Sequence, residues 1–416
     1  MFKEVQLGGS QEFDIQLILY YLALVLVGWL TIFSTSYNPA AEEFFSFNNA
    51  YTRQLIFIGA ALVIAIFILL LKGQYYSFFA YPIYLFFLLV MISVLFIGTN
   101  INGANAWIKI GNFSIQPTEF CKFATALALA KFFSEGKTAQ EKKNRWLPAF
   151  GLVFVPILII LLQKDAGSAL VFFSFILLFY RVGLTGWILA VGGASATLFL
   201  LTLFLNEVYS VAIITTVFVV FWFLNRKSKK KLVRNAVIYG FALLFVAGTN
   251  FAYNNLLQPH QKVRMDILLG KINDPQGDEY NQIQSKIAIG SGGLLGKGYQ
   301  KGTQTKLNFV PEQHTDFIFC GISEEWGFIG SSVTCLLFLG LILRIIRISE
   351  RQRDAFAKYY GYGIAGIIFC HFFINIGMTI GLLPIIGIPL PFISYGGSSL
   401  WAFTIMLFIF IKLDYR

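Results

Sequence analysis

The sequence predicts an all-α fold, a polytopic helical bundle embedded in a membrane. Of the 416 residues, 57% are hydrophobic, 17% are aromatic and only 13% are charged, and the mean hydropathy is +0.69. Soluble domains carry about 25% charged residues, so this composition excludes an ordinary soluble domain. The apolar residues also fall in long stretches separated by short polar loops. No internal repeat is evident, and we expect one transmembrane domain over residues 1–416.

The lengths of the apolar stretches predict about twelve spans, because about 20 apolar residues cross the hydrocarbon core of a bilayer. The first stretch begins near Ile15 without the small-residue cleavage signal of a secretory leader, so we expect it to be retained. The expected spans cover residues 15–35, 54–71, 78–98, 118–133, 147–163, 167–183, 187–205, 208–225, 236–253, 317–345, 361–381 and 392–412.

The formal charge of +11 is explained by topology. Basic residues cluster in the loops at 137–145, 226–234 and 344–358, which all face the same side if both termini are cytoplasmic. Cytoplasmic loops of membrane proteins carry such an excess of lysine and arginine. We therefore expect no nucleic-acid partner, and we expect the loops that hold Trp107 and Asp316 to be extracytoplasmic.

The longest polar segment runs from 254 to 316 and ends at an acid, Asp316, where an apolar helix resumes. Loops of this length are usually functional or disordered. Asp316 could cap the following helix, where a carboxylate accepts from free backbone N–H groups. It could also be a general base that takes a proton from an attacking hydroxyl. The two roles are compatible, and His314 lies beside it in the predicted outward cavity.

A second set of charges lies at the outer ends of other spans. Glu119 and Lys122 are three residues apart, so they share one helix face just after Pro117, and Asp165 lies at a similar depth. Opposite charges in a membrane usually pair, because an unpaired ion is costly there. We favour a structural ion network over direct catalysis for these three residues.

Two basic residues, Lys262 and Arg264, precede Asp316 in the same outward segment. Guanidinium suits bidentate phosphate contacts, although a loop arginine is more often a solvated surface charge. The glycine-rich GSGGLLGKG lacks the strand and helix context of a nucleotide site, and we interpret its glycines as tight turns near a substrate.

Four further features have either two open interpretations or a purely structural one. Trp107 is either an interfacial anchor or a stacking face for a sugar. His371 and Asn375 lie four apart within a span and are interpreted as packing residues, since two ligands are too few for a metal. Prolines within 384–391 break the last helical pair at the outer face, which favours a cavity there because irregular backbone at that depth must pack on protein or line water.

At this point the motifs become specific. The segments NGANAWIKIG, IQPTEFCKFA, QKDAGSAL, IQSKIAIGSGGLLGKGYQKGTQ, FVPEQHTDFIFCGISEEWGFIG and NIGMTIGLLPIIGIPLPFISYGGSSL closely resemble the SEDS family (shape, elongation, division and sporulation) of bacterial membrane proteins. The resemblance spans residues 15 to 412 in the right order. Within the family, QSKIAIGSGG and GIPLPFISYGG resemble the RodA branch rather than the FtsW branch.

The resemblance implies a peptidoglycan glycosyltransferase that polymerises lipid II into β-1,4 glycan strands and releases undecaprenyl pyrophosphate, for cell elongation and rod shape. The acid of the family's HTDFIF motif corresponds to Asp316, the implied catalytic residue. Glu119, Lys122 and Asp165 fall on the family's buried polar network, Arg264 on its loop arginine, and Trp107 on the tryptophan of its first outward loop.

The implied partners are a class B penicillin-binding protein, which is a transpeptidase, and other elongation-complex membrane proteins. The implied location is the bacterial inner (cytoplasmic) membrane, with the active site outside. No cofactor is required by the sequence, although a divalent cation, Mg or Mn, could assist the departing pyrophosphate. Metal ligands are not identifiable from the sequence.

One departure from the family concerns the number of spans. The family usually has ten, so we predict that residues 208–253 are an inserted helical pair. Two alternatives to an enzyme are a lipid II flippase, since broken helices and buried charges suit alternating access, and a noncatalytic scaffold. The absence of an inverted repeat counts against transport.

Overall fold

The computed structural model describes residues 13–37, 46–47, 49–101, 103–111, 113–136, 145–226, 228–256, 259–271, 279–307 and 309–415. The chain divides into two compact units. Unit 1 comprises Met1–Gly183 and Asn281–Arg416, and unit 2 comprises Leu184–Tyr280. Single-domain organisation over the whole chain stays a prediction.

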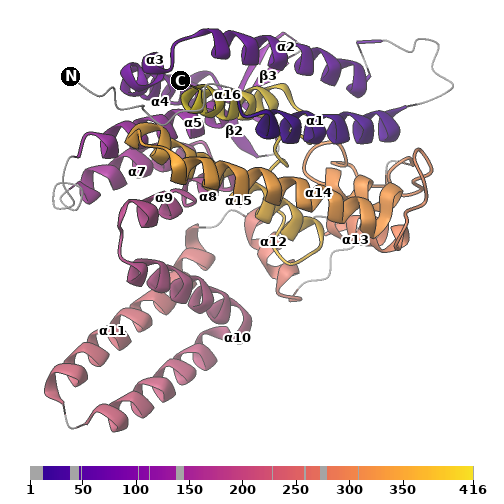
Figure 1. Cartoon of the computed structure of the whole chain (residues 1–416). Helices are drawn as coiled ribbons and strands as arrows, with labels where there is room; N and C mark the ends of the chain where they lie inside the picture. Colours follow the sequence, from indigo (N-terminus) through magenta and orange to yellow (C-terminus); the bar gives the residue numbers. More distant parts are fainter. Residues whose placement is uncertain are drawn as a thin grey trace, which may run out of the picture. The chain divides into compact units, whose positions relative to one another are not determined.

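Unit 1 is a helical bundle with one small sheet (Figure 1). Its elements in chain order are α1 (Ile15–Ser36), α2 (Ala50–Leu70), α3 (Gly73–Phe78), α4 (Ala80–Ile97), β1 (Thr99–Ile101), β2 (Ala104–Ile110), β3 (Phe113–Ile115), α5 (Pro117–Ser134), α7 (Trp146–Leu162), α8 (Ala166–Phe172), α9 (Phe175–Val182), α13 (Tyr280–Gly292), α14 (Ile318–Arg351), α15 (Ala355–Thr379) and α16 (Gly397–Asp414).

The predicted membrane bundle is confirmed in its fold class. Among the described residues, eight helices are long and apolar enough to cross a membrane, namely α1, α2, α4, α14, α15, α16 and the stretches Val208–Asn225 and Lys229–Asn255. Three more apolar helices are shorter: α7, the broken pair at Ala166–Val182, and Ala190–Leu205. Each expected span therefore has a helical counterpart, while the count of twelve crossings stays a prediction.

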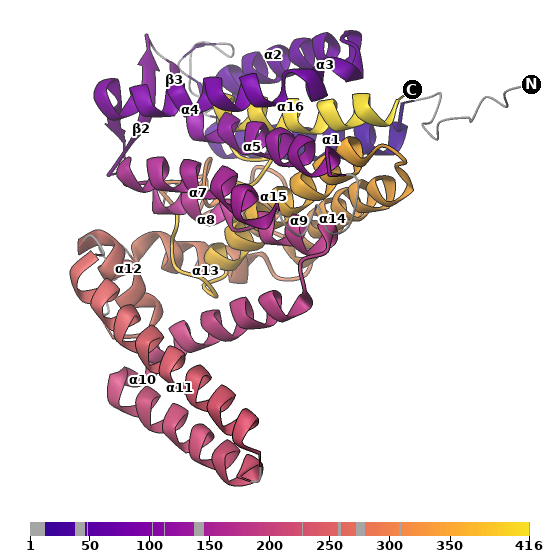
Figure 2. The ribbon, with the colours of Figure 1, turned by 90° about the vertical axis from the view of Figure 1, so that its left-hand side faces the viewer.

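Helix α1 runs antiparallel to α14, and contacts at both ends fix this arrangement. Asp14, just before α1, accepts hydrogen bonds from Arg344 near the end of α14. Ser34, near the end of α1, bonds to Glu325 near the start of α14. The two views show α1, α14 and α15 side by side (Figures 1 and 2). Asp316 thus lies at the end of unit 1 opposite Arg344.

The sheet is an element that the sequence analysis did not predict. It is an antiparallel meander in the order β1-β2-β3, with Thr99 opposite Trp107 and Lys109 opposite Ser114. Its turns contain Gly103 at φ 88° and Gly111 at φ 60°, conformations that glycine adopts without a Cβ penalty. The meander occupies the whole connection between α4 and α5 and contacts both helices.

Helix α14 is broken near its start, at Gly327, which has φ 63° and ψ −157°. A helix break exposes backbone groups that need partners. The segment 293–298 supplies them: Lys297 and Gly298 donate to the carbonyls of residues 324 and 325, and residues 328 and 329 donate back to residues 293 and 294. A Cβ at position 296 would lie 2.1 Å from a backbone oxygen of α14, so only glycine permits this approach.

Unit 2 contains α10 (Gly186–Asn225), α11 (Lys229–Phe251), the π-helix η1 (Ala252–Leu256) and α12 (Pro259–Leu268). The Ser210 hydroxyl donates to the Leu201 carbonyl at 3.2 Å, although nine residues of straight helix would separate them by about 13 Å. Helix α10 therefore bends sharply between them, as its ribbon shows (Figure 1). The two arms correspond to the spans expected at 187–205 and 208–225.

The predicted inserted pair, 208–253, corresponds to the second arm of α10 and to α11, which stack through Phe218 and Tyr239. Its status as an insertion stays a prediction. The segment 254–316 is not a structureless loop, because it contains α12 and α13.

Candidate active site

Asp316 is half-buried and ends a turn that leads into α14. Phe317 is the N-cap residue of that helix, so Asp316 lies one position before the cap. Phe317 is itself 1% exposed and packs with Ala288 of α13, Val310 and Cys320. This apolar cluster anchors the helix start on which the carboxylate depends.

The backbone on both sides of Asp316 is held by three consecutive carbonyl groups, each of which accepts a hydrogen bond. Tyr395 N–H donates to the His314 oxygen at 2.8 Å. The Ser394 hydroxyl donates to the Thr315 oxygen at 2.6 Å, and Asn375 Nδ2 donates to the Asp316 oxygen at 2.7 Å. All three donors come from α15 or from the segment that follows it. The geometry of the acid is therefore set by residues about 60 to 80 positions later.

The segment 380–396 that supplies these donors is non-helical and passes directly by the acid. Its Gly387 has φ 76°, and a Cβ at that position would lie 3.4 Å from Asp316 Oδ2. The helix break predicted at the prolines within 384–391 is present here. The small residue lets this backbone pass close to the carboxylate, and the predicted outward cavity stays a prediction.

His314 is tied to helix α1. Its Nδ1 lies 3.1 Å from the Thr35 hydroxyl, and the residue is half-buried. Burial lowers the pKa of His314 below its usual value, and the nearby charge of Glu312 opposes this effect. Through its contact with Thr35, His314 links the turn to α1.

Glu119 and Lys122 form the expected buried pair, with Lys122 Nζ 2.6 Å from Glu119 Oε1. Lys122 also lies 2.8 Å from Nε2 of His371, a residue that the sequence analysis treated as packing only. Glu119 and Lys122 are 3% and 1% exposed. Asp165 is bonded elsewhere: it caps α8 through the Ser168 N–H.

Asp165 also accepts from the Gln116 amide at 2.8 Å and the Ser168 hydroxyl at 2.7 Å. Because Gln116 is the N-cap residue of α5, this contact ties the start of α5 to the start of α8. The structure therefore gives Asp165 a helix-capping and bridging role, in place of a direct pairing with the lysine of α5.

The remaining predicted residues are Trp107 of unit 1 and two basic residues of unit 2. Trp107 is half-buried in β2, opposite Thr99. Arg264 and Lys262 lie on α12 of unit 2, where Lys262 is 4.9 Å from the Tyr253 ring centre and within hydrogen-bond distance of Asn254. The roles of these three residues toward a substrate stay predictions.

The expected role of the glycines of GSGGLLGKG, as turns near a substrate, stays a prediction. The loop that follows them binds an acid of the chain: the backbone N–H groups at residues 303, 304 and 305 donate to the Glu324 carboxylate at 2.8, 2.9 and 3.0 Å. Lys297 Nζ lies 2.7 Å from the same carboxylate, and Glu324 is fully buried. The loop wraps an acid of the chain itself, so at least these amides are occupied by protein and are not available to a substrate.

Comparison with known proteins agrees with these motifs. The FtsW/RodA/SpoVE family model, described as "Cell cycle protein", matches residues 15–225 and 194–416. The chain belongs to this family. It is 31% identical to "Peptidoglycan glycosyltransferase RodA" of Treponema pallidum, over 99% of this chain and 100% of the relative. It is also 31% identical to "Peptidoglycan glycosyltransferase MrdB" of Escherichia coli K12, over 93% of this chain and 89% of the relative.

A solved structure supports the fold as well. One chain of the solved structure described as "Structural coordination of polymerization and crosslinking by a peptidoglycan synthase complex" superposes on this chain with a TM-score of 0.69 and 28% sequence identity. The alignment covers 97% of this chain and 98% of that one.

In this member of the family, sequence reasoning missed four supporting residues: Asn375, His371, Ser394 and Glu324. Their partners are mostly backbone atoms far away in the sequence, and backbone partners leave no residue pattern. The i, i+4 spacing of His371 and Asn375 was the one available signal, since it places both on one face of α15.

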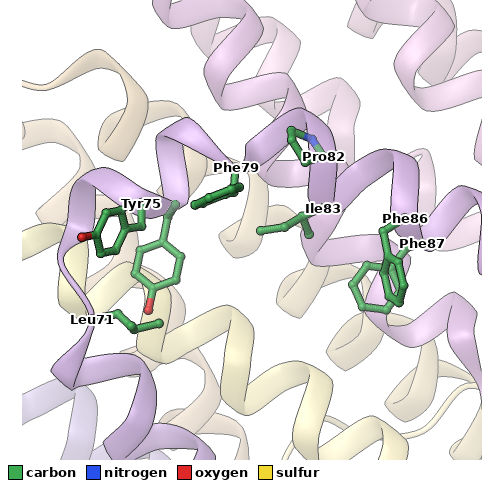
Figure 3. Close-up of a pocket in the computed structure, with 8 residues that line it drawn as sticks. Leu71, Tyr75, Phe79, Pro82, Ile83, Phe86 and Phe87 are labelled. Carbon is green, nitrogen blue, oxygen red and sulfur yellow. The ribbon is translucent and has the colours of Figure 1, made fainter.

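The close-up in Figure 3 shows an apolar pocket on α3 and α4, with a volume of about 340 Å³. Its lining does not include Asp316 or the residues that hold it. The lining residues are Leu71, Tyr75, Tyr76, Phe79, Pro82, Ile83, Phe86 and Phe87.

Proposed function

We propose that this chain is a peptidoglycan glycosyltransferase of the RodA type, which polymerises lipid II into β-1,4-linked glycan strands and releases undecaprenyl pyrophosphate. The observation that carries the proposal is the placement of Asp316, a half-buried acid whose backbone is held at three consecutive carbonyls. The names of its relatives, RodA and MrdB, support the reaction class and the role in elongation.

The proposed chemistry needs one base. The Asp316 carboxylate accepts the proton of the acceptor sugar's 4-hydroxyl, and the resulting oxygen attacks C1 of the donor. The bond between C1 and the phosphate oxygen breaks, and the pyrophosphate leaves with the electron pair. Attack opposite an α-linked leaving group gives a β-linkage, so the enzyme inverts. Holding the carboxylate in one geometry lowers the entropic part of the barrier.

The departing pyrophosphate requires positive charge, and Arg264 and Lys262 are the proposed source. Their helix, α12, precedes α13, which packs on the end of α15 through Ser285 and Gln282. Trp107 is proposed to contact the sugar from the β meander, and His314 to line the same cavity. These assignments go beyond the contacts within each unit and are tested by substitution.

The proposed location is the bacterial inner membrane, with both termini cytoplasmic and the acid extracytoplasmic. The support comes from unit 1, where Arg344 and Arg351 gather with Asp14 and Asp414 at the end opposite Asp316. Positive residues favour the cytoplasmic side. A cysteine introduced near Asp316 should be labelled by a membrane-impermeant reagent from outside, whereas labelling only from the cytoplasm would contradict this orientation.

The proposed partner is a class B penicillin-binding protein, together with other membrane proteins of the elongation complex. The support is that a similar chain was solved in a "peptidoglycan synthase complex" of "polymerization and crosslinking". Co-purification of the chain with a candidate transpeptidase tests it.

The described residues contain no group of three or more His, Cys, Asp or Glu side chains that could hold a metal ion. We therefore derive no step through a resident metal centre. A Mg or Mn ion carried by the pyrophosphate itself would neutralise leaving-group charge with few protein ligands.

The deciding experiment incubates the purified chain with lipid II, alone and with its transpeptidase. We expect glycan strands from the parental chain and at least about a 100-fold lower rate from Asp316→Asn, which removes the base and keeps the size of the side chain. Polymerisation by the variant at the parental rate would refute the assignment of Asp316.

The break in α14 at Gly327 favours one second candidate, a lipid II flippase, since discontinuous helices are common in transporters. In liposomes, lipid II that crosses the bilayer without polymerising would support transport. A chain that does neither, and whose Asp316→Asn variant supports normal cell shape, would be a scaffold.

A further inference from the structure

Hydrogen bonds on either side of the Ile388–Pro389 peptide connect the buried ion pair of α5 to the backbone of Asp316. Two side chains on successive turns of α15 make these bonds. His371 Nδ1 lies 3.0 Å from the Pro389 carbonyl oxygen, and Asn375 Nδ2 lies 2.7 Å from the carbonyl oxygens of both Ile388 and Asp316. His371 and Asn375 are 1% and 0% exposed.

The chemistry of the partners fixes the protonation state of His371. A carbonyl oxygen only accepts, so Nδ1 carries the hydrogen that points to Pro389. Lysine ammonium only donates, so Nε2 accepts from Lys122. His371 is therefore neutral, with its hydrogen on Nδ1, and Lys122 selects that tautomer. Glu119, in turn, holds Lys122 from the other side.

The orientation of Asn375 is equally determined. Its nitrogen faces two carbonyl oxygens, and a flipped amide would place a third oxygen against both. Both N–H groups of the Asn375 amide are thus used, one by the carbonyl oxygen of Asp316 and one by the carbonyl oxygen of Ile388. The amide fixes the separation between Asp316 and the segment 387–389, which contains the Gly387 that faces the carboxylate.

We propose that Asn375 and His371 are positioning residues for Asp316: Asn375 clamps the acid's own carbonyl to Ile388, and His371 clamps Pro389 to the Glu119–Lys122 pair. This proposal rests on the proposed function for its effect on rate, while the clamp itself is a structural statement that can be tested without substrate.

The first test compares Asn375→Leu, which keeps the size of the side chain and removes both donors, with Thr379→Val. Thr379 is a matched control because it is buried one turn further along α15 and its hydroxyl bonds only to its own helix. Hydrogen exchange is measured on peptides that cover residues 311–320. We expect faster exchange there in Asn375→Leu and parental exchange in Thr379→Val. Equal exchange in the two variants would overturn the clamp, whether or not the chain polymerises lipid II.

The second readout is catalytic. A misplacement of about 1 Å can lower a rate about 100-fold, so we expect Asn375→Leu to lower kcat by about 10- to 100-fold. KM for lipid II should stay within about twofold, because the clamp contacts no substrate. A loss confined to KM, or a loss equal to that of Thr379→Val, would overturn the positioning role. Failure of Asp316→Asn to reduce activity is a separate result, which refutes the base and leaves the exchange data to decide the clamp.

The third test covers the case in which Asn375→Leu fails to fold. In His371→Asn the side-chain amide nitrogen can lie near the position of the histidine Nδ1. In His371→Gln the amide nitrogen reaches the position of Nε2 instead. His371→Asn should therefore keep the contact to Pro389 and retain more of the parental kcat than His371→Gln. The opposite order, or equal losses, would contradict a role exerted through Pro389.

Discussion

Glu324 holds the segment 297–306 in place, and its replacement offers a prediction that does not depend on catalysis. The carboxylate accepts from three backbone N–H groups, from the hydroxyls of Thr303 and Thr305, and from Lys297. Glu324→Ala removes all of these contacts and leaves buried donors without an acceptor. The segment from 297 to 306 should then open far more often.

The size of the effect follows from burial. Removing one partner of a buried charge pair costs about 3–5 kcal/mol. Lys297 is 25% exposed and can return to water, so the lower figure applies. A loss of about 3 kcal/mol raises the open population by about 100-fold, at about 1.4 kcal/mol per tenfold change. Glu324→Gln should fall between the parent and the alanine variant, because one amide oxygen still accepts.

Limited trypsin digestion measures this opening. Lys301 and Lys306 lie exposed in the segment, and cleavage of a transiently open segment follows its population when opening is fast. Glu135→Ala is the matched control, since its two ion pairs are exposed and contribute about 0–1 kcal/mol. Cleavage after Lys301 and Lys306 should rise about 100-fold in Glu324→Ala. A rise of less than about threefold in that variant would refute the reasoning about burial.

Three further predictions concern the acid and its supports. Burial lowers the pKa of His314, so below pH about 6.5 the unfolded chain binds a proton more readily than the folded chain. Stability therefore decreases as the pH is lowered. His314→Gln should show a smaller decrease in melting temperature between about pH 8 and pH 5 than the parent. Gly387→Ala places a Cβ in the left-handed region beside the carboxylate, at a strain of about 1–2 kcal/mol, and should lower kcat, whereas Gly59→Ala in open space on α2 should not. Lys122→Met leaves Glu119 unpaired and should cost about 3–5 kcal/mol in thermal unfolding, of which adding Glu119→Gln should recover a part. Equal melting temperatures for the single and double variants would contradict the last of these.

The parts of the fold that the sequence predicts are those set by local physics. Apolar runs near bilayer length predict helices, and the structure has a helix at each. The spacing of Glu119 and Lys122 predicts their pairing, because residues three apart on a helix meet. Asp316 stands out because an acid at the junction of polar segment and apolar helix is costly without a role.

The parts that the sequence does not predict depend on backbone partners. Three donors to Glu324 are backbone amides of residues 303–305, and backbone amides are present in any residue type, so the sequence gives no sign of this contact. Asp165 was grouped with Lys122 by depth alone, and depth does not distinguish a neighbour from a helix cap. The meander at 99–115 was missed because strands this short leave few alternating positions to recognise.

The two irregular segments of unit 1 explain why the acid lies where it does. Backbone outside helices at the edge of a bilayer must find its partners within the protein. The segment 293–298 finds them in the break of α14, and the segment 388–395 finds them in α15 and in the turn that carries Asp316. The first segment supports α14 at its break, and the second supports the turn that carries Asp316. The backbone of the acid is therefore fixed by the second segment and by Asn375, while the first segment supplies the hydrogen bonds that the broken helix lacks.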